Sequence, residues 1–458
     1  MTIETALAGL SALLGDRLSR SKSDLAAHGR SEAHFAPAPP DAVAYPETTQ
    51  EVASIAAICN ENACPLIAYG AGTALEGHTS AIQGGVSLDF RHMDRVIRVS
   101  PGDMLAVVGP GLTREALNRE LRATGLFFPV DPGANASLGG MAATRASGTT
   151  AVRYGTMRDN VLALEVVLAD GRIVRTGTDA RKSAAGYDLT ALMLGSEGTL
   201  GIITELTLKL QGQPEAITAG TCAFDSIAAA VGAVTAVIQA GVPMARIEFL
   251  DEASIAAVNA HAGTDLPETP HLFVEFHGSD GAVAEDAATF AEIAADFGAQ
   301  GIQTATRTED RNALWAARHH AYWACLGLKP GATALITDIC VPISRLAQAV
   351  EDTRADIEAA SIPGPILGHV GDGNFHAILL VDPDSPADLA EARRLSARMA
   401  TRALDLGGTV TGEHGIGIGK LDYMAKQHGE GWAVMAAIKQ ALDPNGILNP
   451  GKMVRVNR

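Results

Sequence analysis

Two histidines, His369 and His376, flank a short Gly-Asp-Gly-Asn turn. Because such a turn folds the chain back on itself, both imidazoles could point at one place, which is typical of a metal site. A second glycine-rich loop, 407–420, carries Glu413 and His414, and it offers these side chains little packing. Two neutral imidazoles and one carboxylate would form a three-ligand site with open positions, as catalytic zinc or manganese uses. A structural role for the histidine pair is the alternative.

Three further loops are rich in small residues, and they cover 69–74, 131–148 and 195–204. Small residues let backbone N–H groups approach a phosphate closely. A plain strand-to-loop turn is the more ordinary interpretation of any one such loop. The first loop lacks the third glycine of the nicotinamide fingerprint, and no Gly-Lys-Ser/Thr follows it. Three loops together indicate a long ligand with two phosphates and a flat ring, that is, a dinucleotide.

Arg318 lies in an otherwise apolar helical stretch, 314–325. An arginine in such surroundings could bind a substrate carboxylate in bidentate fashion. A salt bridge to an acidic residue of the protein is the alternative.

The composition bounds the class of protein that carries these residues. The chain has 458 residues, of which 47% are hydrophobic and 19% charged, as in soluble globular proteins of more than one domain. Its net charge of -17 argues against a nucleic-acid partner. We expect no transmembrane segment and no secretion signal. Five scattered cysteines are expected to be reduced thiols: Cys59, Cys64, Cys222, Cys325 and Cys340.

The hydrophobic patterning predicts an α+β protein. Short apolar runs alternate with glycine-rich turns between residues 65 and 210, which indicates strands with intervening helices. Longer alanine-rich helices follow, separated by strands such as 271–276. We expect four parts, namely an N-terminal helical segment (1–37), a cofactor domain (38–215), a substrate or cap domain with an antiparallel sheet (216–425) and a C-terminal segment that returns to the cofactor domain (426–458).

The glycine-rich loops resemble the two-subdomain FAD-binding domain of the vanillyl-alcohol oxidase type flavoproteins. The resemblance rests on 65–73, Asp131-Pro-Gly, 137–148, 182–189 and 195–201. It implies that 69–74 wraps the pyrophosphate, that 131–148 lines the flavin and that Gly201 to Ile203 hold the adenine side. The implied FAD-binding residues are Tyr69, Gly70, Ala71, Gly72, Thr73, Ala74, Pro132, Gly133, Ser137, Gly139, Gly140, Ala143, Ser147, Gly148, Gly201, Ile202, Ile203 and Asn449.

The first loop also bears on how the flavin is held. Relatives with covalent flavin often place a histidine beside the paired glycines, whereas this chain has Ala71 there. We therefore expect non-covalent FAD, although His78 follows a few residues later.

The second half resembles the FAD-linked, cytochrome-reducing D-lactate dehydrogenases and their relatives acting on D-2-hydroxyglutarate and glycolate. The sequences His-Val-Gly-Asp-Gly-Asn-Phe-His and Gly-Glu-His-Gly-Ile-Gly carry this resemblance. It implies His369, His376 and Glu413 as metal ligands and His414 as the proton acceptor, in agreement with the residue chemistry above. Relatives acting on D-2-hydroxyglutarate carry a lysine in the strand matching 335–340, where this chain has none, so D-lactate is favoured.

The resulting hypothesis is a D-2-hydroxy-acid dehydrogenase that converts D-lactate to pyruvate. Arg318 and Asn374 would hold the substrate carboxylate, His414 would take the hydroxyl proton, and hydride would pass from C2 to flavin N5. No haem or iron–sulfur motif is present, so the electrons need an external acceptor such as a cytochrome, a quinone or an electron-transfer flavoprotein.

Alternatives within the family are glycolate or D-2-hydroxyglutarate as substrate. Outside it, a metal-dependent hydrolase, a non-redox flavin transferase or a silent binding protein are the competing classes. We further expect a cytoplasmic protein, at most peripheral to the inner membrane, and a homodimer is compatible with the sequence.

Overall fold

The computed structural model describes residues 3–31 and 33–455. Residues 1–2 and 32 of the expected N-terminal segment, and 456–458 of the C-terminal one, lie outside the described residues. The chain forms two compact units, which are Met1–Ser147, Gly155–Gln213 and Glu413–Arg458 in the first, and Gly148–Tyr154 and Pro214–Gly412 in the second. The change of unit near 214 lies close to the expected boundary at 215. The return begins at 413 rather than 426, because Glu197 and Glu76 of the first unit hydrogen-bond the backbone of 416–419.

The first unit contains a four-stranded sheet of order β1-β2-β4-β3, in which β4 pairs in parallel with β2 and β3. Helices α1 and α3 share its hydrophobic core. The elements are α1 (Ile3–Leu14), β1 (Leu18–Ser19), α2 (Lys22–His28), β2 (Ala42–Ala44), α3 (Thr49–Glu61), β3 (Leu66–Tyr69) and β4 (Val86–Asp89).

A second, antiparallel sheet of order β5-β6-β10-β8-β9 completes the first unit together with the short pair β7 and β11. In the turn between β8 and β9, Gly171 follows Asp170 and has a φ of 84°, the positive angle that Asp-Gly pairs supply in tight hairpin turns. The strands are β5 (Val96–Ser100), β6 (Leu105–Val108), β7 (Leu126–Phe127), β8 (Val161–Val167), β9 (Ile173–Arg175), β10 (Ile202–Lys209) and β11 (Gln211–Gly212). The helices are α4 (Arg114–Leu121), α5 (Leu138–Thr144), α7 (Met157–Asn160), α8 (Leu189–Met193), α16 (Met424–His428) and α17 (Glu430–Leu442).

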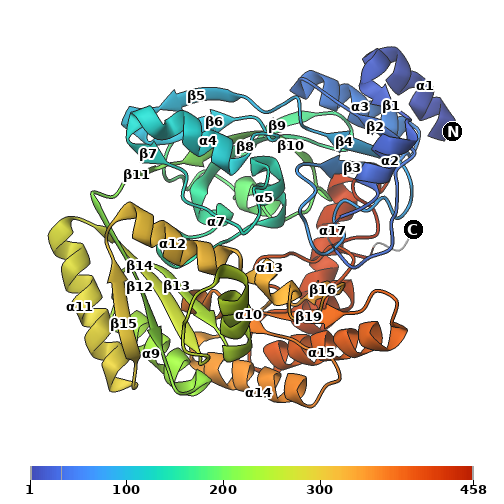
Figure 1. Cartoon of the computed structure of the whole chain (residues 1–458). Helices are drawn as coiled ribbons and strands as arrows, with labels where there is room; N and C mark the ends of the chain where they lie inside the picture. Colours follow the sequence, from blue (N-terminus) through green and yellow to red (C-terminus); the bar gives the residue numbers. More distant parts are fainter. Residues whose placement is uncertain (1–2, 32, 456–458) are drawn as a thin grey trace. The chain divides into compact units, whose positions relative to one another are not determined.

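The second unit is built on an antiparallel sheet of order β15-β12-β14-β13-β18-β19-β16, with β17 also paired to β19. Its strands can be followed from green to orange in Figure 1. They are β12 (Ala216–Ala223), β13 (Met244–Leu250), β14 (His271–Gly278), β15 (Gln300–Ala305), β16 (Thr333–Ile336), β17 (Ile339–Cys340), β18 (Ile366–Gly368) and β19 (Asn374–Val381).

Helices cover both faces of this sheet, each over its own hydrophobic core. On one face lie α9 (Ile227–Gln239), α11 (Asp280–Asp296), α14 (Leu346–Glu358) and α15 (Pro386–Asp405). On the other lie α10 (Glu252–Ala262), α12 (Thr308–His319) and α13 (Ala321–Leu326). The short helix α6 (Ala151–Tyr154) also contacts β13.

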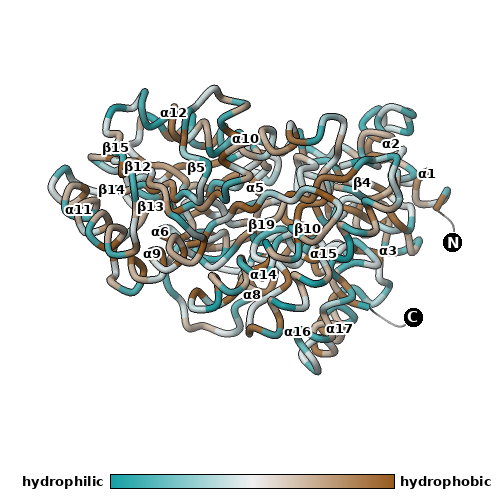
Figure 2. The backbone as a smooth tube through the Cα atoms, turned by 60° about the horizontal axis from the view of Figure 1, so that its bottom comes forward, coloured by the Kyte–Doolittle hydropathy of each residue, from teal (hydrophilic) through white to brown (hydrophobic). Residues whose placement is uncertain are grey.

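Local sequence explains where several of these helices begin. Thr48, Ser226, Ser279 and Ser385 each accept a hydrogen bond from a backbone N–H of the first helical turn, in α3, α9, α11 and α15 respectively. The elements also differ in hydropathy, as Figure 2 shows. The apolar run of β19 is brown, whereas the charged helix α12 carries teal stretches. The α+β class with an antiparallel sheet in the second unit is confirmed.

Two simpler expectations concern the membrane and the thiols. Among the residues that the structure describes, no helix is both long enough and apolar enough to cross a membrane. All five cysteines are free thiols, and burial raises the pKa of Cys222, Cys325 and Cys340 to about 12.

Candidate active site

The two predicted histidine ligands lie on either side of the turn between β18 and β19. His369 follows β18, a single turn at Val370–Asp372 comes next, and His376 lies on β19. Gly373 ends the turn with a φ of 81°, and a Cβ there would lie 2.1 Å from the carbonyl oxygen of Val341, so only glycine fits. The turn places the centroids of the two imidazole rings 5.5 Å apart.

Glu413 completes the cluster that the sequence predicts. One ligand atom from each of His369, His376 and Glu413 lies within 4.8 Å of the other two. Ligand atoms about 2.0 to 2.2 Å from one zinc ion lie within roughly 4.4 Å of each other. The cluster therefore needs only small side-chain movements to hold a metal.

Hydrogen bonds fix which nitrogen of each histidine is available as a ligand. His369 Nδ1 lies 2.8 Å from Glu248 Oε1, and His376 Nδ1 lies 3.0 Å from the carbonyl oxygen of Thr337. Both partners are acceptors, so each Nδ1 carries the proton and each Nε2 has the lone pair. This is the tautomer that metal binding through Nε2 requires.

The carboxylate of Asp338, which is 1% exposed, holds the chain next to Glu413. Its Oδ2 accepts hydrogen bonds from Thr411 Oγ1 at 2.6 Å and from the backbone N–H of Gly412 at 2.9 Å. Its Oδ1 accepts one from Asn374 Nδ2 at 2.7 Å. Asp338 thus fixes the residue that directly precedes the predicted carboxylate ligand.

Asn374 was predicted to bind the substrate carboxylate. Its amide donates to Asp338 and, at 2.7 Å, to the carbonyl oxygen of Ile339, so both Nδ2 hydrogens are used within the protein. A contact with substrate is therefore left to Oδ1, an acceptor that suits a hydroxyl group rather than a carboxylate. Its role toward substrate stays a prediction.

Arg318 forms a buried ion pair with Glu248. Its Nε and Nη2 donate to Glu248 Oε2 at 3.0 and 2.6 Å. Nη1 makes no hydrogen bond to any described residue. The salt bridge that the sequence left open as an alternative is therefore present, while one edge of the guanidinium is still available to a carboxylate.

The first glycine-rich loop starts at the end of β3, as expected. Ser137 Oγ accepts a hydrogen bond from Ala71 N at 3.3 Å, which joins this loop to the start of α5. A Cβ on Gly70 would lie 2.1 Å from Ser137 Oγ, and one on Gly72 would lie 2.3 Å from Tyr69 Oη. These close approaches leave room only for glycine at both positions, and a loop of such small residues is typical of a phosphate cradle.

The other residues predicted to bind FAD fall into several places. Gly139, Gly140 and Ala143 lie on α5, while Pro132, Gly133, Ser147 and Gly148 lie in the loops on either side of it. Gly201 precedes β10, and a Cβ there would lie 2.4 Å from Val166 Cγ1. Ile202 and Ile203 have buried side chains in hydrophobic cores, so a ligand contact there would be made by the backbone.

The comparisons with known proteins decide the family. The FAD binding domain family matches residues 40–177, and the family of FAD linked oxidases, C-terminal domain, matches 213–453. The chain is 49% identical over 435 residues to the probable mitochondrial D-lactate dehydrogenase of Danio rerio, covering 94% of this chain and 88% of that one. It is 44% identical over 448 residues to the mitochondrial D-lactate dehydrogenase [cytochrome] of Arabidopsis thaliana, covering 97% and 79%. The chain belongs to the FAD-linked D-lactate dehydrogenase family.

The fold of this chain is also similar to those of solved structures. The crystal structure of p-cresol methylhydroxylase matches with a TM-score of 0.79 at 17% identity, covering 98% of this chain and 96% of that one. This similarity concerns the fold. It agrees with the vanillyl-alcohol oxidase type that the sequence predicts for this FAD-linked enzyme.

The expectation of a cytoplasmic protein is wrong by the same comparison. Relatives from fish, plant and yeast carry names that place those proteins in mitochondria. Reduced cysteines do not distinguish these compartments.

The structure also contains a buried polar cluster around Glu197, which the sequence did not predict. Burial alone would raise the pKa of Glu197, but His78 at 3.3 Å and the backbone N–H groups of Ile416 and Gly417 lower it overall. Asn449, predicted to lie near the flavin ring, donates to the carbonyl oxygens of His78 and Glu197. The cluster anchors the C-terminal segment.

Lys452 adds a buried amino group to this cluster. Its Nζ donates to the carbonyl oxygens of His78 and Ser80 and to Asn449 Oδ1. Burial lowers the pKa of Lys452 to about 7, although the charge of Glu197 acts in the opposite direction. The lysine in the final Asn-Pro-Gly-Lys turn was the available sequence signal.

Two buried carboxylates behind the histidines were also missed. Glu248 lies in Arg-Ile-Glu-Phe-Leu and Asp338 in Ile-Thr-Asp-Ile-Cys, where a charge interrupts a strand that is otherwise mostly apolar. An acidic residue in such a strand is rarely buried without a partner. That pattern was the signal that would have found both.

Replacing Gly70 by alanine tests the phosphate cradle. We expect Gly70→Ala to lower the FAD content of the purified protein, because the new Cβ would displace Ser137 Oγ and move the loop. Gly102→Ala is the control, since nothing lies within 4 Å of the position of its Cβ. The ratio of flavin to protein absorbance measures the effect, and equal ratios in both variants would contradict it.

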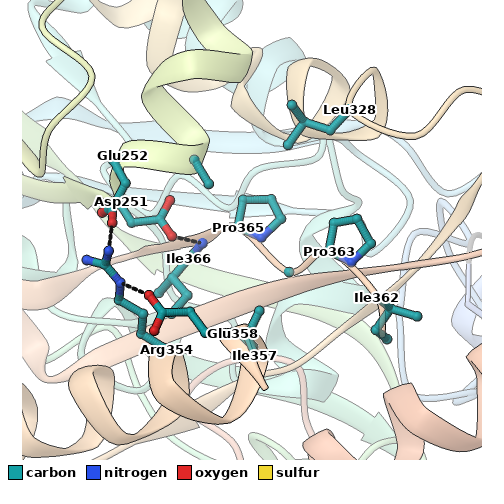
Figure 3. Close-up of a pocket in the computed structure, with 12 residues that line it drawn as sticks. Asp251, Glu252, Leu328, Arg354, Ile357, Glu358, Ile362, Pro363, Pro365 and Ile366 are labelled. Atoms are coloured by element: carbon teal, nitrogen blue, oxygen red, sulfur yellow. Dashed lines mark hydrogen bonds and ion pairs between the residues drawn. The ribbon is translucent and has the colours of Figure 1, made fainter. Parts of the chain in front are cut away.

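A separate pocket of about 250 Å³ lies in the second unit, between Asp251 and Ile366 (Figure 3). Among the residues that line it, Arg354 forms ion pairs with Glu252 and Glu358. Burial raises the pKa of Asp251 to about 6. None of the predicted site residues lines this pocket.

Proposed function

We propose that the protein oxidises D-lactate to pyruvate with non-covalent FAD and a divalent metal, zinc or manganese, bound by His369, His376 and Glu413. The observation that carries the metal assignment is the convergence of these three side chains within 4.8 Å. The tautomers of both histidines support it, because each presents Nε2. Ala71 in the first FAD loop supports the non-covalent attachment.

The substrate is expected to be a small D-2-hydroxy acid. Arg318 Nη1 offers two N–H donors to its carboxylate, and Glu248 fixes the guanidinium in place. Strands β16 and β17 carry no lysine that would bind a second carboxylate. This favours D-lactate over D-2-hydroxyglutarate, while glycolate is the alternative that the same residues would accept.

The residues of this chain orient the substrate and take its proton. When bound, the metal supplies a Lewis acid for the substrate hydroxyl, and FAD supplies the hydride acceptor. Arg318 holds the carboxylate, and Asn374, whose amide is fixed by Asp338 and the carbonyl oxygen of Ile339, contacts the substrate beside it without taking its proton. His414, the residue after the carboxylate ligand, accepts the hydroxyl proton as general base. Electrons then leave to an external acceptor, for which a cytochrome, a quinone or an electron-transfer flavoprotein is suitable.

Steady-state assays with an artificial electron acceptor test the substrate. We expect kcat/KM for D-lactate to exceed that for D-2-hydroxyglutarate by about 10-fold or more, because the second carboxylate would be desolvated without a partner. L-lactate is the stereochemical control and should be oxidised far more slowly. A higher kcat/KM for D-2-hydroxyglutarate or glycolate would transfer the assignment to that acid.

A further inference from the structure

Glu248 is a fully buried carboxylate between two residues of the proposed site. It lies on β13 with 0% exposure, while its neighbours Ile247 and Phe249 point into the core on the opposite face of the sheet. Its Oε2 accepts both hydrogen bonds of Arg318, from α12. Both of its oxygens lie within 3.0 Å of His369 Nδ1, in the loop after β18.

Burial of this charge is costly unless its partners are in place. Removing a carboxylate from water is unfavourable, and an ion pair offsets the lost hydration only with good geometry and additional hydrogen bonds. A hydrophobic residue at this position would often be as stable or more so. Stability alone therefore gives a weak reason for a glutamate at 248.

We propose that Glu248 is a positioning residue that couples the metal ligand His369 to the carboxylate-binding Arg318. Its negative charge keeps the proton on His369 Nδ1, so that Nε2 is presented as the ligand. The same carboxylate occupies the Nε and Nη2 edge of Arg318, so that Nη1 is the donor presented to substrate. This inference rests on the proposed function. It adds one residue on which the orientation of both the metal ligand His369 and the carboxylate-binding Arg318 depends.

A glutamine at 248 removes this dual function. Its side chain has one acceptor oxygen and one amide group that donates, so it faces either His369 Nδ1–H or Arg318 with a donor. We expect Glu248→Gln to weaken metal binding by about 10- to 100-fold, as loss of an outer partner of a histidine ligand does. We also expect KM for D-lactate to rise about 10-fold or more. Arg318 would no longer be held by a carboxylate, so its hydrogen bond to the charged group of the substrate would be misplaced.

Glu275→Gln is the matched control. Glu275 is also a buried carboxylate, on the neighbouring strand β14, and it accepts hydrogen bonds from Trp315 of α12 and from His277. It contacts the same helix and has a histidine partner, but none of its partners, Trp315, His277 and Arg246, belongs to the proposed site. A purely structural role for Glu248 predicts similar behaviour of the two variants.

The experiment uses the FAD-containing full chain, stripped of metal by a chelator and titrated calorimetrically with Mn²⁺. KM for D-lactate is measured in parallel on the metal-loaded enzyme. Weaker Mn²⁺ binding together with a raised KM in Glu248→Gln, but not in Glu275→Gln, supports the proposal. Wild-type Mn²⁺ affinity or wild-type KM in Glu248→Gln overturns it. Failure of the wild-type protein to bind Mn²⁺, and also Zn²⁺ in a parallel titration, would instead reject the proposed metal-dependent function.

Glu248→Asp serves if the glutamine variant does not fold. Aspartate keeps the charge but is shorter by one methylene group, so it cannot reach Arg318 and His369 together. We expect Mn²⁺ affinity or KM to worsen in this variant also. Unchanged values of both would overturn the coupling role.

Discussion

Replacing His414 by alanine is expected to lower kcat for D-lactate by about 10²- to 10⁴-fold, the usual contribution of a general base. The substrate would still be held by Arg318 through its carboxylate, so KM should change much less than kcat. The flavin content should stay at the wild-type level, because none of the residues predicted to bind FAD is altered.

His428→Ala is the control for this variant. His428 lies at the end of α16, in the same C-terminal segment, and it is partly buried as His414 is. Rapid-mixing measurement of flavin reduction by D-lactate compares the two variants with the wild type. A reduction rate in His414→Ala within about 3-fold of the wild-type rate would remove His414 from the role of base.

Replacing His376 by alanine is expected to remove the metal and most of the activity. A Lewis acid contributes several kcal/mol to such a reaction, so kcat should fall by about 10³-fold or more. Metal content by elemental analysis should fall with it, while FAD stays bound, since the cofactor loops lie in other segments of the chain.

His271→Ala is a close match for this change. His271 is also a buried strand histidine, and its Nδ1 lies 2.7 Å from the carbonyl oxygen of Thr269, just as His376 Nδ1 bonds Thr337. It is not part of the cluster. Normal metal content or normal turnover in His376→Ala would contradict the metal assignment, whereas His271→Ala should retain both.

Much of the fold follows from local sequence signals. The strands β3, β4, β6, β8, β10 and β14 coincide with apolar runs that the sequence shows, to within a residue or two at each end. Serine and threonine caps mark the starts of α3, α9, α11 and α15, because their hydroxyl groups satisfy N–H groups that the helix leaves without partners. These signals act over a few residues, and they are therefore readable without the structure.

The supporting residues of the site could not be predicted in the same way. Arg318 and Glu248 are 70 positions apart, and Ile416 lies 219 positions from Glu197, which accepts its N–H. No local pattern encodes which strand a buried arginine will meet. The return of the chain at 413 rather than 426 has the same cause, since it depends on acceptors in distant loops.

The individual glycine-rich loops show an intermediate case. Gly70 and Gly373 stand out in the sequence only as glycines among others. The structure gives each a specific reason, which is the close approach of Ser137 Oγ to the first and of the Val341 carbonyl to the second. Whether such a glycine contributes to a ligand site depends on how segments far apart in the chain pack together.

An anaerobic absorbance spectrum of the purified protein, recorded before and after addition of D-lactate, tests whether bound FAD and metal together oxidise this acid. We predict loss of the flavin band near about 450 nm with D-lactate but not with L-lactate, and we predict that a chelator abolishes the change. Bleaching only by another 2-hydroxy acid would change the substrate and keep the chemistry. A protein that carries no flavin and cannot be reconstituted with FAD would contradict the FAD-dependent oxidation. Equal bleaching without metal would contradict the role of the metal.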